Sequence, residues 1–315
     1  MARILVGTAS WADPSLIKTK RFYPKDASKP EPMLRYYATR FPMVEVDSSY
    51  YALPSPANAQ KWAERTPDDF TFNIKAYRLL TGHQTPRVAL PKDIQDALAL
   101  HFVEKKNLYY KDTPLEIRDE IWRRYELGIR PLRDAGKLKA VHFQFPHWVK
   151  PAPQTIAHVE ECVDRLAGYH LAVEFRSIGW FDGTRDNDTL DWETRLGVTH
   201  VIVDEPQNIP SQSIPQVWAT TNERLAIVRL HGRNEETWDI KGATVASDRF
   251  NYDYTDLELG QLARQIEEIA AAVQETHVVF NNNYEDQGVR NATTLMEQLG
   301  LARPGSWPTP EREIV

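Results

Sequence analysis

Residues 44–51 read Val44-Glu45-Val46-Asp47-Ser48-Ser49-Tyr50-Tyr51. Successive side chains of a β-strand point to opposite faces, so the two valines would share one face and the two carboxylates the other. In a closed parallel barrel, one face of each strand packs against helices, whereas the other faces the lumen. The segment therefore predicts a barrel strand that ends with Glu45 and Asp47 turned inward.

Short runs of β-branched and aromatic residues, bounded by turn residues, recur along the chain and predict eight strands. They are Ile4–Ala9, Val44–Ser48, Thr71–Ala76, Ala140–Phe145, Leu171–Phe175, His200–Asp204, Ala226–His231 and Val278–Asn282. Helical patterns between and after them include Glu31–Arg40, Pro56–Glu64, Pro153–Leu166, Leu190–Leu196, Leu257–Val273 and Thr293–Leu299. Eight alternating units favour an α/β fold, a TIM-like (β/α)8 barrel. An open doubly wound sheet is the alternative, but no glycine-rich phosphate fingerprint follows the first strand.

One connection is much longer than the others and runs from Tyr77 to Lys139, between the third and fourth strands. It contains helical patterns at Pro91–Glu104 and at Pro114–Arg124, the second running on toward Leu132, with a loop at Lys105–Asp112. We expect a helical insertion over residues 78–138, acting either as a lid or wall above the strand ends or as a packing element. The remainder is expected to be one barrel domain over residues 1–301 and an extended tail over 302–315.

The composition is that of an ordinary globular protein. The 315 residues are 42% hydrophobic and 26% charged, and the net charge of −6 argues mildly against a protein that depends on phosphate backbones for affinity. The single cysteine, Cys162, excludes an intrachain disulfide and a cysteine metal cluster. Because there is no stretch long enough to span a membrane and no signal-peptide pattern, we expect a cytoplasmic protein without membrane association.

Alternation places polar side chains in the lumen of nearly every predicted strand, mostly toward the carboxyl ends. An ordinary barrel lumen is filled by branched apolar side chains, and unpaired buried charges are costly. Ion pairs within the set could make it a self-satisfied structural network, but active sites of this fold cluster at the same rim, which favours a ligand site. The other inward residues are Asn73, Lys75, His142, Gln144, Glu174, Arg176, Asp204, Arg229, His231, Asn281 and Asn283, with Thr8 and Ser10 as a weaker pair.

The same segments resemble the signature segments of a known family. Residues 7–11 (GTASW) resemble its GTSGW, and residues 44–51 resemble its vEiNsTFY. Further motifs of the family are matched in order: FYP at 22–24, vKa at 73–76, TH at 81–83, fQfP at 143–146, EfR at 174–176, RlHG at 229–232 and FNN at 280–283. In this order, from about residue 4 to residue 300, the chain resembles the DUF72 (YecE-like) family. The resemblance implies a TIM-like barrel and brings no assigned reaction. Asp47 stands where the family usually has Asn, and Tyr50 where it usually has Phe.

Acid–base chemistry requires proton carriers and a group that stabilises charge. We expect Glu45, Glu174 and His231 to handle protons, and an anionic group of the ligand to be held by basic side chains of the same ring. These roles indicate a hydrolase-like or other acid–base enzyme acting on a phosphate- or carboxylate-bearing sugar or nucleotide-like ligand. The expected ligand-binding residues are Lys75, Gln144, Arg176, Asp204, Arg229, Asn281, Asn283, Trp11 and Tyr50.

Other chemistries have less support. Barrel glycosidases often place carboxylates on strands four and seven, where this chain has Gln144 and Arg229. A divalent metal could use carboxylates of the ring, but three basic side chains compete with it, so no metal ligand is assigned and no cofactor is required.

A non-catalytic module that binds nucleic acid or a small molecule is the alternative, and it requires a basic rim. The sequence does not fix the oligomeric state. Candidate rim residues are Lys18, Lys20, Arg21, Lys25, Lys105, Lys106 and Lys111.

Overall fold

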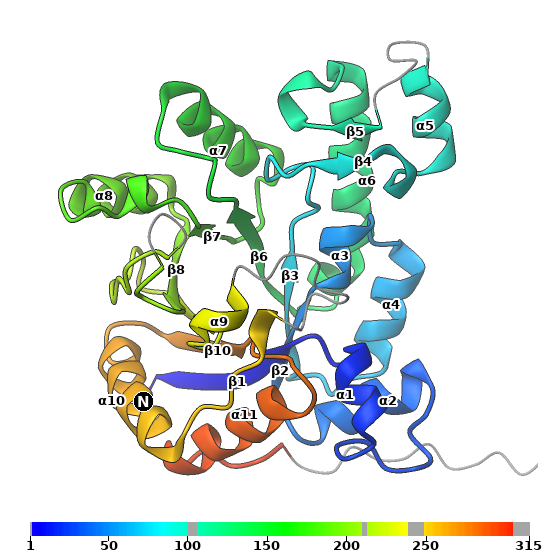
Figure 1. Cartoon of the computed structure of the whole chain (residues 1–315). Coiled ribbons are helices and arrows are strands. Elements are labelled where there is room, and N and C mark those ends of the chain that lie inside the picture. Colours follow the sequence, from blue (N-terminus) through cyan, green and yellow to red (C-terminus); the bar gives the residue numbers. More distant parts are fainter. Residues whose placement is uncertain (1, 100–105, 210–212, 239–248, 305–315) are drawn as a thin grey trace, which may run out of the picture.

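The computed structural model describes residues 2–99, 106–209, 213–238 and 249–304. Eight parallel strands close into a ring with helices outside it (Figure 1). The strands are β1 (Arg3–Ala9), β2 (Met43–Val46), β3 (Thr71–Lys75), β6 (Leu138–Phe145), β7 (Leu171–Phe175), β8 (Thr199–Asp204), β9 (Leu225–Leu230) and β10 (Glu275–Phe280). Neighbours in the ring follow chain order, and the β1–β10 pairing closes it. The predicted TIM-like barrel and its eight strands are confirmed, with ends shifted by at most three residues.

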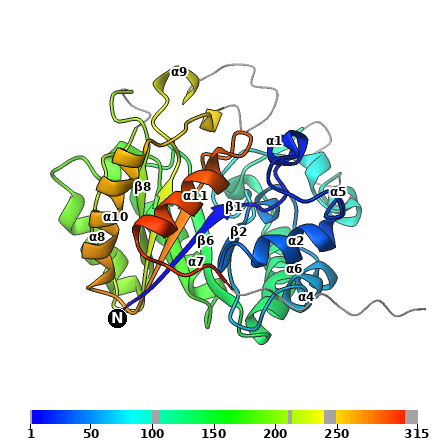
Figure 2. The ribbon, with the colours of Figure 1, turned by 90° about the horizontal axis from the view of Figure 1, so that it is seen from below.

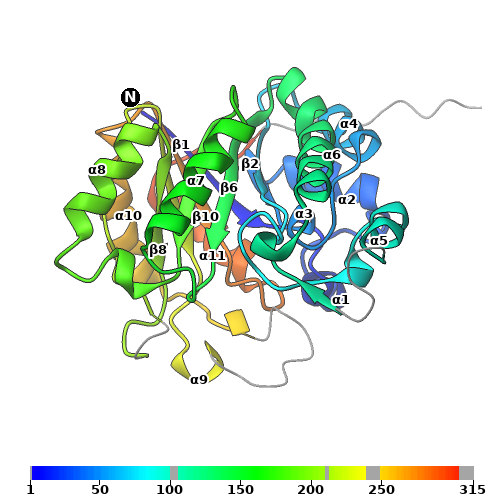
Figure 3. The same cartoon turned by 90° about the horizontal axis from the view of Figure 1, so that it is seen from above.

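Helices surround the barrel, and several begin with a recognisable cap. Ser55 caps α4 through the backbone N–H of Asn58, and Thr255 and Glu258 form a capping box at the start of α10. In the side views of Figures 2 and 3, α9 lies beyond the carboxyl ends of the strands. The helices are α1 (Pro14–Thr19), α2 (Pro30–Ala38), α3 (Ser48–Tyr51), α4 (Pro56–Glu64), α5 (Lys92–Ala99), α6 (Leu115–Asp134), α7 (Pro153–Arg165), α8 (Asp186–Leu196), α9 (Glu235–Trp238), α10 (Asp256–Ala270) and α11 (Gln287–Gln298).

The long connection between β3 and β6 contains both an ordinary barrel helix and extra elements. Helix α6 packs against α4, and its Gly128 lies so close to Pro54 that an added Cβ would be 2.1 Å from the Pro54 carbonyl oxygen. The extra elements are a two-stranded antiparallel sheet of β4 (Thr85–Pro86) and β5 (Asn107–Leu108), together with α5. The predicted insertion over 78–138 therefore includes α6, a regular part of the barrel. Part of the expected Pro91–Glu104 helix falls on residues 100–105, outside the described residues.

The main core lies between the outer face of the barrel and the helices. Outward side chains of the strands, such as Val46, Ile74, Phe143 and Phe175, join the apolar helix faces there. Inside the barrel, a smaller apolar cluster fills part of the lumen and includes Val201, Val203 and Ile227. Farther along, toward the carboxyl ends of the strands, the lumen is lined by the inward polar side chains of β2, β3, β6, β7 and β9. The fold thus sets a polar layer near the carboxyl end of the lumen. A further inward polar group lies nearer the amino ends of the strands, where His277 contacts the predicted inward Asn73 at 3.0 Å and Glu275 at 2.8 Å.

Two expected inward positions are corrected by the strand register. Thr8 lies on the outer face of β1, where its backbone N–H donates to the hydroxyl of Tyr37 in α2 at 2.8 Å. Asp204 is in register with Leu230, an outward core residue, while its neighbour Val203 is in register with the inward Arg229. Both strands carry apolar residues on both faces, and therefore alternation alone did not fix which face is inside.

Candidate functional site

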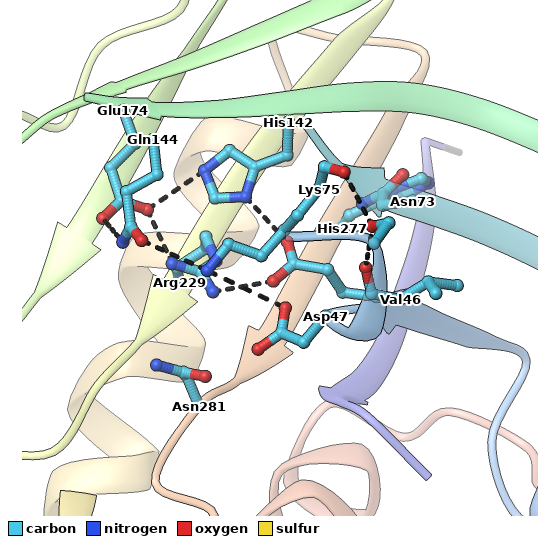
Figure 4. Close-up of polar contacts among 12 residues, drawn as sticks. Val46, Asp47, Asn73, Lys75, His142, Gln144, Glu174, Arg229, His277 and Asn281 are labelled. Carbon is cyan, nitrogen blue, oxygen red and sulfur yellow. Dashed lines mark hydrogen bonds and ion pairs between the residues drawn. The ribbon is translucent and has the colours of Figure 1, made fainter. Parts of the chain in front are cut away.

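A single buried guanidinium joins two carboxylates across the lumen. Arg229 of β9 donates from Nη1 to Oε2 of Glu174 in β7 at 2.7 Å (Figure 4). Its Nη2 donates to Oε1 of Glu45 in β2, also at 2.7 Å. All three residues are fully buried. Charge-assisted bonds of this length are the strong kind, and they offset the cost of removing three charges from water. The predicted convergence of these inward residues is present, with Arg229 enclosed by protein groups.

Two histidines complete this central cluster, which we define as Glu45, Glu174, Arg229, His142 and His231. The ring of His142 lies between the carboxylates, with Nε2 3.2 Å from Glu174 (Figure 4) and Nδ1 3.1 Å from Glu45. His231 places Nε2 3.4 Å from Glu174 and Nδ1 2.8 Å from the side-chain nitrogen of Asn281. Asn281, the residue directly after β10, therefore supports a residue of the cluster.

Electrostatics hold the central carboxylates in the charged form. Burial alone would raise the pKa of Glu45, but Arg229 and His142 outweigh it and keep that pKa below its ordinary value. Burial is likewise outweighed at Glu174, where Arg229 and His231 hold the pKa well below the usual range. Burial lowers the pKa of His231 to about 3 against the attraction of Glu174, so this imidazole is neutral near pH 7. The predicted proton carriers Glu45 and Glu174 are thus fixed as anions at neutral pH.

A second layer lies above the cluster, toward the mouth, and contains a looser ion pair. Gln144 donates to Glu174 at 2.6 Å and accepts from Lys75 Nζ at 3.1 Å, which fixes the orientation of its amide. Lys75 Nζ lies 3.9 Å from Asp47 Oδ1 (Figure 4). We call Asp47 and Lys75 the mouth pair. Their side chains are 21% and 10% exposed, in contrast to the closed cluster beneath them.

Local structure positions the mouth pair at the ends of β2 and β3. The Ser49 hydroxyl, in the first turn of α3, bridges the carbonyl oxygens of Val46 and Lys75 at 2.9 and 2.7 Å. Tyr125 of α6 donates to the same Lys75 carbonyl at 2.9 Å. These bonds fix the strand ends that carry Asp47 and Lys75, while both charged groups point to the mouth.

The carboxyl of Asp47 has the properties expected of a proton carrier. Burial raises its pKa to about 6, opposed by the nearby Lys75 ammonium and reinforced by the negative charge of Glu45. A group with this pKa is present in both protonation states near neutral pH. Among the sequence expectations Asp47 was an inward carboxylate without an assigned catalytic role, and its looser pairing with Lys75 at 3.9 Å is what distinguishes it from Glu45 and Glu174.

Arg176 links the cluster to a carboxylate that alternation did not identify. Its Nη1 donates to Glu174 at 3.0 Å, and its Nη2 lies 2.5 Å from Oε2 of Glu205. Burial raises the pKa of Glu205 to about 7 although Arg176 opposes the shift. Trp238 of α9 covers Arg176, with the guanidinium carbon 5.2 Å from the ring centroid. Glu205 follows the end of β8, so strand alternation gave no signal for it.

The structure separates Asp204 from the central cluster. Its carboxylate accepts from Arg233 at 2.8 Å and from the Tyr254 hydroxyl at 2.5 Å. Tyr254 in turn accepts from the backbone N–H of Gly232 at 2.9 Å. This second buried cluster ties the end of β8 to the segment after β9. The pairing of Asp204 with Lys75, Arg176 or Arg229 that the sequence suggested is absent among the contacts described for these residues.

Other predicted ligand-binding residues lie in different surroundings. Trp11 packs edge-to-face against Trp62 of α4 at 5.7 Å and is only 8% exposed. Asn283 donates to Asp13 at 3.3 Å, on the α1 side of the mouth. Tyr50 remains beside the mouth pair, with Lys75 Nζ 5.2 Å from its ring centroid. Of these three, only Tyr50 lies in contact with the cluster or the mouth pair.

Within 2–99, 106–209, 213–238 and 249–304, no group of three or more His, Cys, Asp or Glu side chains is arranged to hold a metal ion. In the same ranges, no helix combines the length and the apolar character needed to cross a membrane.

Among the basic residues proposed for a nucleic-acid rim, Arg21 is paired with Glu285 and Asp286, and Lys105 is outside the described residues.

Comparisons with known proteins agree with the barrel and identify its relatives. The family described as "Protein of unknown function DUF72" matches residues 5–313. The UPF0759 protein YunF of Bacillus subtilis is 29% identical over 307 residues, covering 97% of this chain and 98% of its own. A solved DUF72 family structure from Enterococcus faecalis has a TM-score of 0.77 at 23% identity, covering 98% of this chain and 99% of its own. One from Thermotoga maritima has a TM-score of 0.73 at 28% identity, covering 95% and 99%. The chain therefore belongs to the DUF72 family.

Proposed function

We propose that this protein is an enzyme that carries out general acid–base chemistry, with hydrolysis as the leading reaction class, at the carboxyl end of the barrel. Its ligand would be a sugar- or nucleotide-like molecule bearing a phosphate or carboxylate. The observation that carries the proposal is the mouth pair. Asp47 and Lys75 lie 3.9 Å apart, are partly exposed, and stand directly above a closed network of ions.

In this proposal the proton carrier is Asp47. General catalysis is most effective when the pKa of the acid or base lies near the working pH, and burial brings Asp47 to about 6. Glu45 and Glu174 would act as fixed negative charges that hold Arg229 and the histidines in place. His231, neutral near pH 7, would support Glu174 and Asn281 rather than carry the proton.

The anionic group of the ligand would bind at Lys75. The ammonium is already held by Gln144, and at 3.9 Å its pairing with Asp47 is weaker than a direct hydrogen bond. A phosphate or carboxylate that approaches Lys75 would place the adjoining bond of the ligand beside Asp47. Arg176 is 16% exposed and could add a second contact, although Glu174 and Glu205 already engage both its terminal nitrogens.

An activity screen over phosphoesters, glycosides and carboxylic esters tests the proposal. For the substrate that is turned over, we expect Asp47→Asn to lower kcat by at least about a hundredfold, the usual contribution of a general acid or base. Lys75→Met should mainly raise KM. The control is Asp253→Asn, because that carboxylate is 44% exposed and pairs with Arg290 on the surface. Turnover by Asp47→Asn equal to that of the unaltered protein would overturn the proposal.

A further inference from the structure

Aromatic side chains form a continuous row beside the mouth pair. Tyr51 and Tyr50 meet edge-to-face at 4.9 Å, Tyr50 meets His83 at 5.1 Å, and His83 meets Trp148 at 5.7 Å. We call these four residues the aromatic row. They follow the ends of three neighbouring strands, β2, β3 and β6, so the row runs along one side of the barrel mouth.

Hydrogen bonds within the chain hold His83 and Trp148 of the aromatic row. His83 donates its backbone N–H to the Arg78 carbonyl at 3.0 Å, and its Nδ1 lies 2.8 Å from the Thr81 hydroxyl oxygen. Burial lowers the pKa of His83 to about 3, so this ring is neutral and retains its packing across the physiological range. The indole N–H of Trp148 donates to the Gly82 carbonyl at 3.4 Å. His83 and Trp148 are therefore oriented by bonds within the chain itself, which reduces the entropy lost on binding.

The two ends of the row are exposed, whereas two cations lie over the ring of Tyr50 between them. Tyr51 is 52% exposed and Trp148 is 48% exposed. The ring of Tyr50 has Lys75 Nζ at 5.2 Å and the Arg78 guanidinium carbon at 5.3 Å from its centroid. Exposed rings held rigidly beside a charged site are a common feature of ligand subsites.

We infer that Trp148 is the stacking residue of a ligand subsite that extends from Lys75 along the aromatic row. This inference rests on the proposed function, because it takes Lys75 as the anchor of the anionic group. Tyr50 and His83 stand between Lys75 and Trp148 in the order of contacts, so we take the ligand's ring to be separated from its anionic group. The ligand class is a phosphate or carboxylate joined through a spacer to a flat or sugar ring. A nucleoside monophosphate and a phosphorylated disaccharide share this chemistry.

Calorimetric titration of the full chain tests the subsite with four probes: adenosine monophosphate, a phosphorylated disaccharide, glucose 6-phosphate and inorganic phosphate. We expect one of the two long ligands to bind more tightly than the short ones. Trp148→Ala should weaken that long ligand about tenfold or more, the usual size of a stacking contact, and leave inorganic phosphate unchanged. Trp148→Phe should restore most of the affinity. Leu257→Ala, which removes an exposed side chain on α10, should change neither.

The result that would overturn the subsite is equal affinity of the long and short ligands, or a long ligand indifferent to Trp148→Ala. Binding of a single-stranded oligonucleotide with no binding of any of the small probes would also overturn it. Failure of the proposed function gives a different result. Asp47→Asn would then retain full turnover, whether or not Trp148→Ala changes ligand affinity. Loss of turnover in Asp47→Asn without any effect of Trp148→Ala would remove the subsite alone.

Discussion

The central cluster and the mouth pair contain the same kinds of charge in adjacent layers, yet they behave differently. In the cluster, Arg229 donates to Glu45 and Glu174 at 2.7 Å each, and none of the three is exposed. In the mouth pair, Asp47 and Lys75 are 3.9 Å apart and partly open to solvent. Glu45 and Glu174 stay charged because Arg229 and the histidines outweigh their burial, whereas Asp47, whose pairing with Lys75 is looser, can take up a proton. Glu205 shows that one close cation is not enough, because burial raises its pKa to about 7 although Arg176 Nη2 lies 2.5 Å from its Oε2.

The largest expected effect comes from breaking the cluster. Arg229→Met would leave Glu45 and Glu174 buried without their shared cation. We expect the free energy of unfolding to fall by about 3–5 kcal/mol, as is usual when one partner of a buried ion pair is removed. Urea unfolding measures the loss. The control is Arg303→Met, whose pairing with Glu297 is exposed on both sides and should contribute less than about 1 kcal/mol. A loss at Arg229 as small as that of the control would contradict the closed cluster.

A smaller effect, with a pH signature, is expected for Glu174→Gln. The folded-state pKa of Glu174 is below its unfolded value, so its stabilisation is present above about pH 4.5 and is lost as pH falls. The unaltered protein should therefore lose stability steeply in acid. Glu174→Gln should be less stable near pH 7 by about 2–3 kcal/mol, the worth of a hydrogen bond to a charged group. Its decline below pH 4.5 should also be shallower. Parallel unfolding curves from pH 3 to pH 8 would argue against the assignment.

The second buried cluster provides a comparison away from the mouth. Tyr254→Phe removes the hydroxyl that donates to Asp204 and accepts from Gly232. We expect a loss of about 1–2 kcal/mol in the free energy of unfolding, since Asp204 keeps Arg233 as a partner. Turnover of the substrate found in the screen should be nearly unchanged after correction for folded protein. A selective loss of turnover would place Asp204 in the site after all.

The last stability effect concerns Asp47, and its sign is opposite. The folded-state pKa is raised to about 6 from an unfolded value of 3.8, so ionisation of Asp47 opposes folding. That cost is fully present above pH 6 and disappears as pH falls below 3.8. Asp47→Asn should therefore be more stable by roughly 1–3 kcal/mol at pH 7–8, because the rise from 3.8 to about 6 corresponds to about 3 kcal/mol before screening by solvent at the partly exposed carboxyl. Near pH 3 the variant should equal the unaltered protein. A variant destabilised at both ends of this range would contradict the raised pKa.

Local alternation predicted much of the site but could not supply its pairings. Glu45, Lys75, Gln144, Glu174 and Arg229 were placed inside because each occupies the polar face of a strand whose other face is apolar. Which carboxylate meets which cation depends on strands far apart in the chain, and on the shared register of the closed barrel. That information is absent from any single segment.

The misplaced residues show where the alternation of polar and apolar residues along a strand gives no information about which face is inside. The strand from Thr199 to Asp204 is buried along its whole length, so Asp204 could be assigned to either face from the sequence. Glu205 lies after the strand, where the pattern stops. The difference between Glu45 and Asp47, two residues apart, was also not predictable, because it arises from contacts with Arg229 and Lys75 that only the folded barrel creates.

The most direct test of the account is the titration of the Asp47 carboxyl itself. Nuclear magnetic resonance of protein with 13C-labelled aspartate carboxyls, recorded from pH 3 to pH 8, would follow each aspartate separately. One resonance should titrate with a midpoint near pH 6 and should be missing from Asp47→Asn. If the resonance missing from that variant instead titrates below pH 4, Asp47 is an ordinary carboxylate and the distinction between the mouth pair and the central cluster fails.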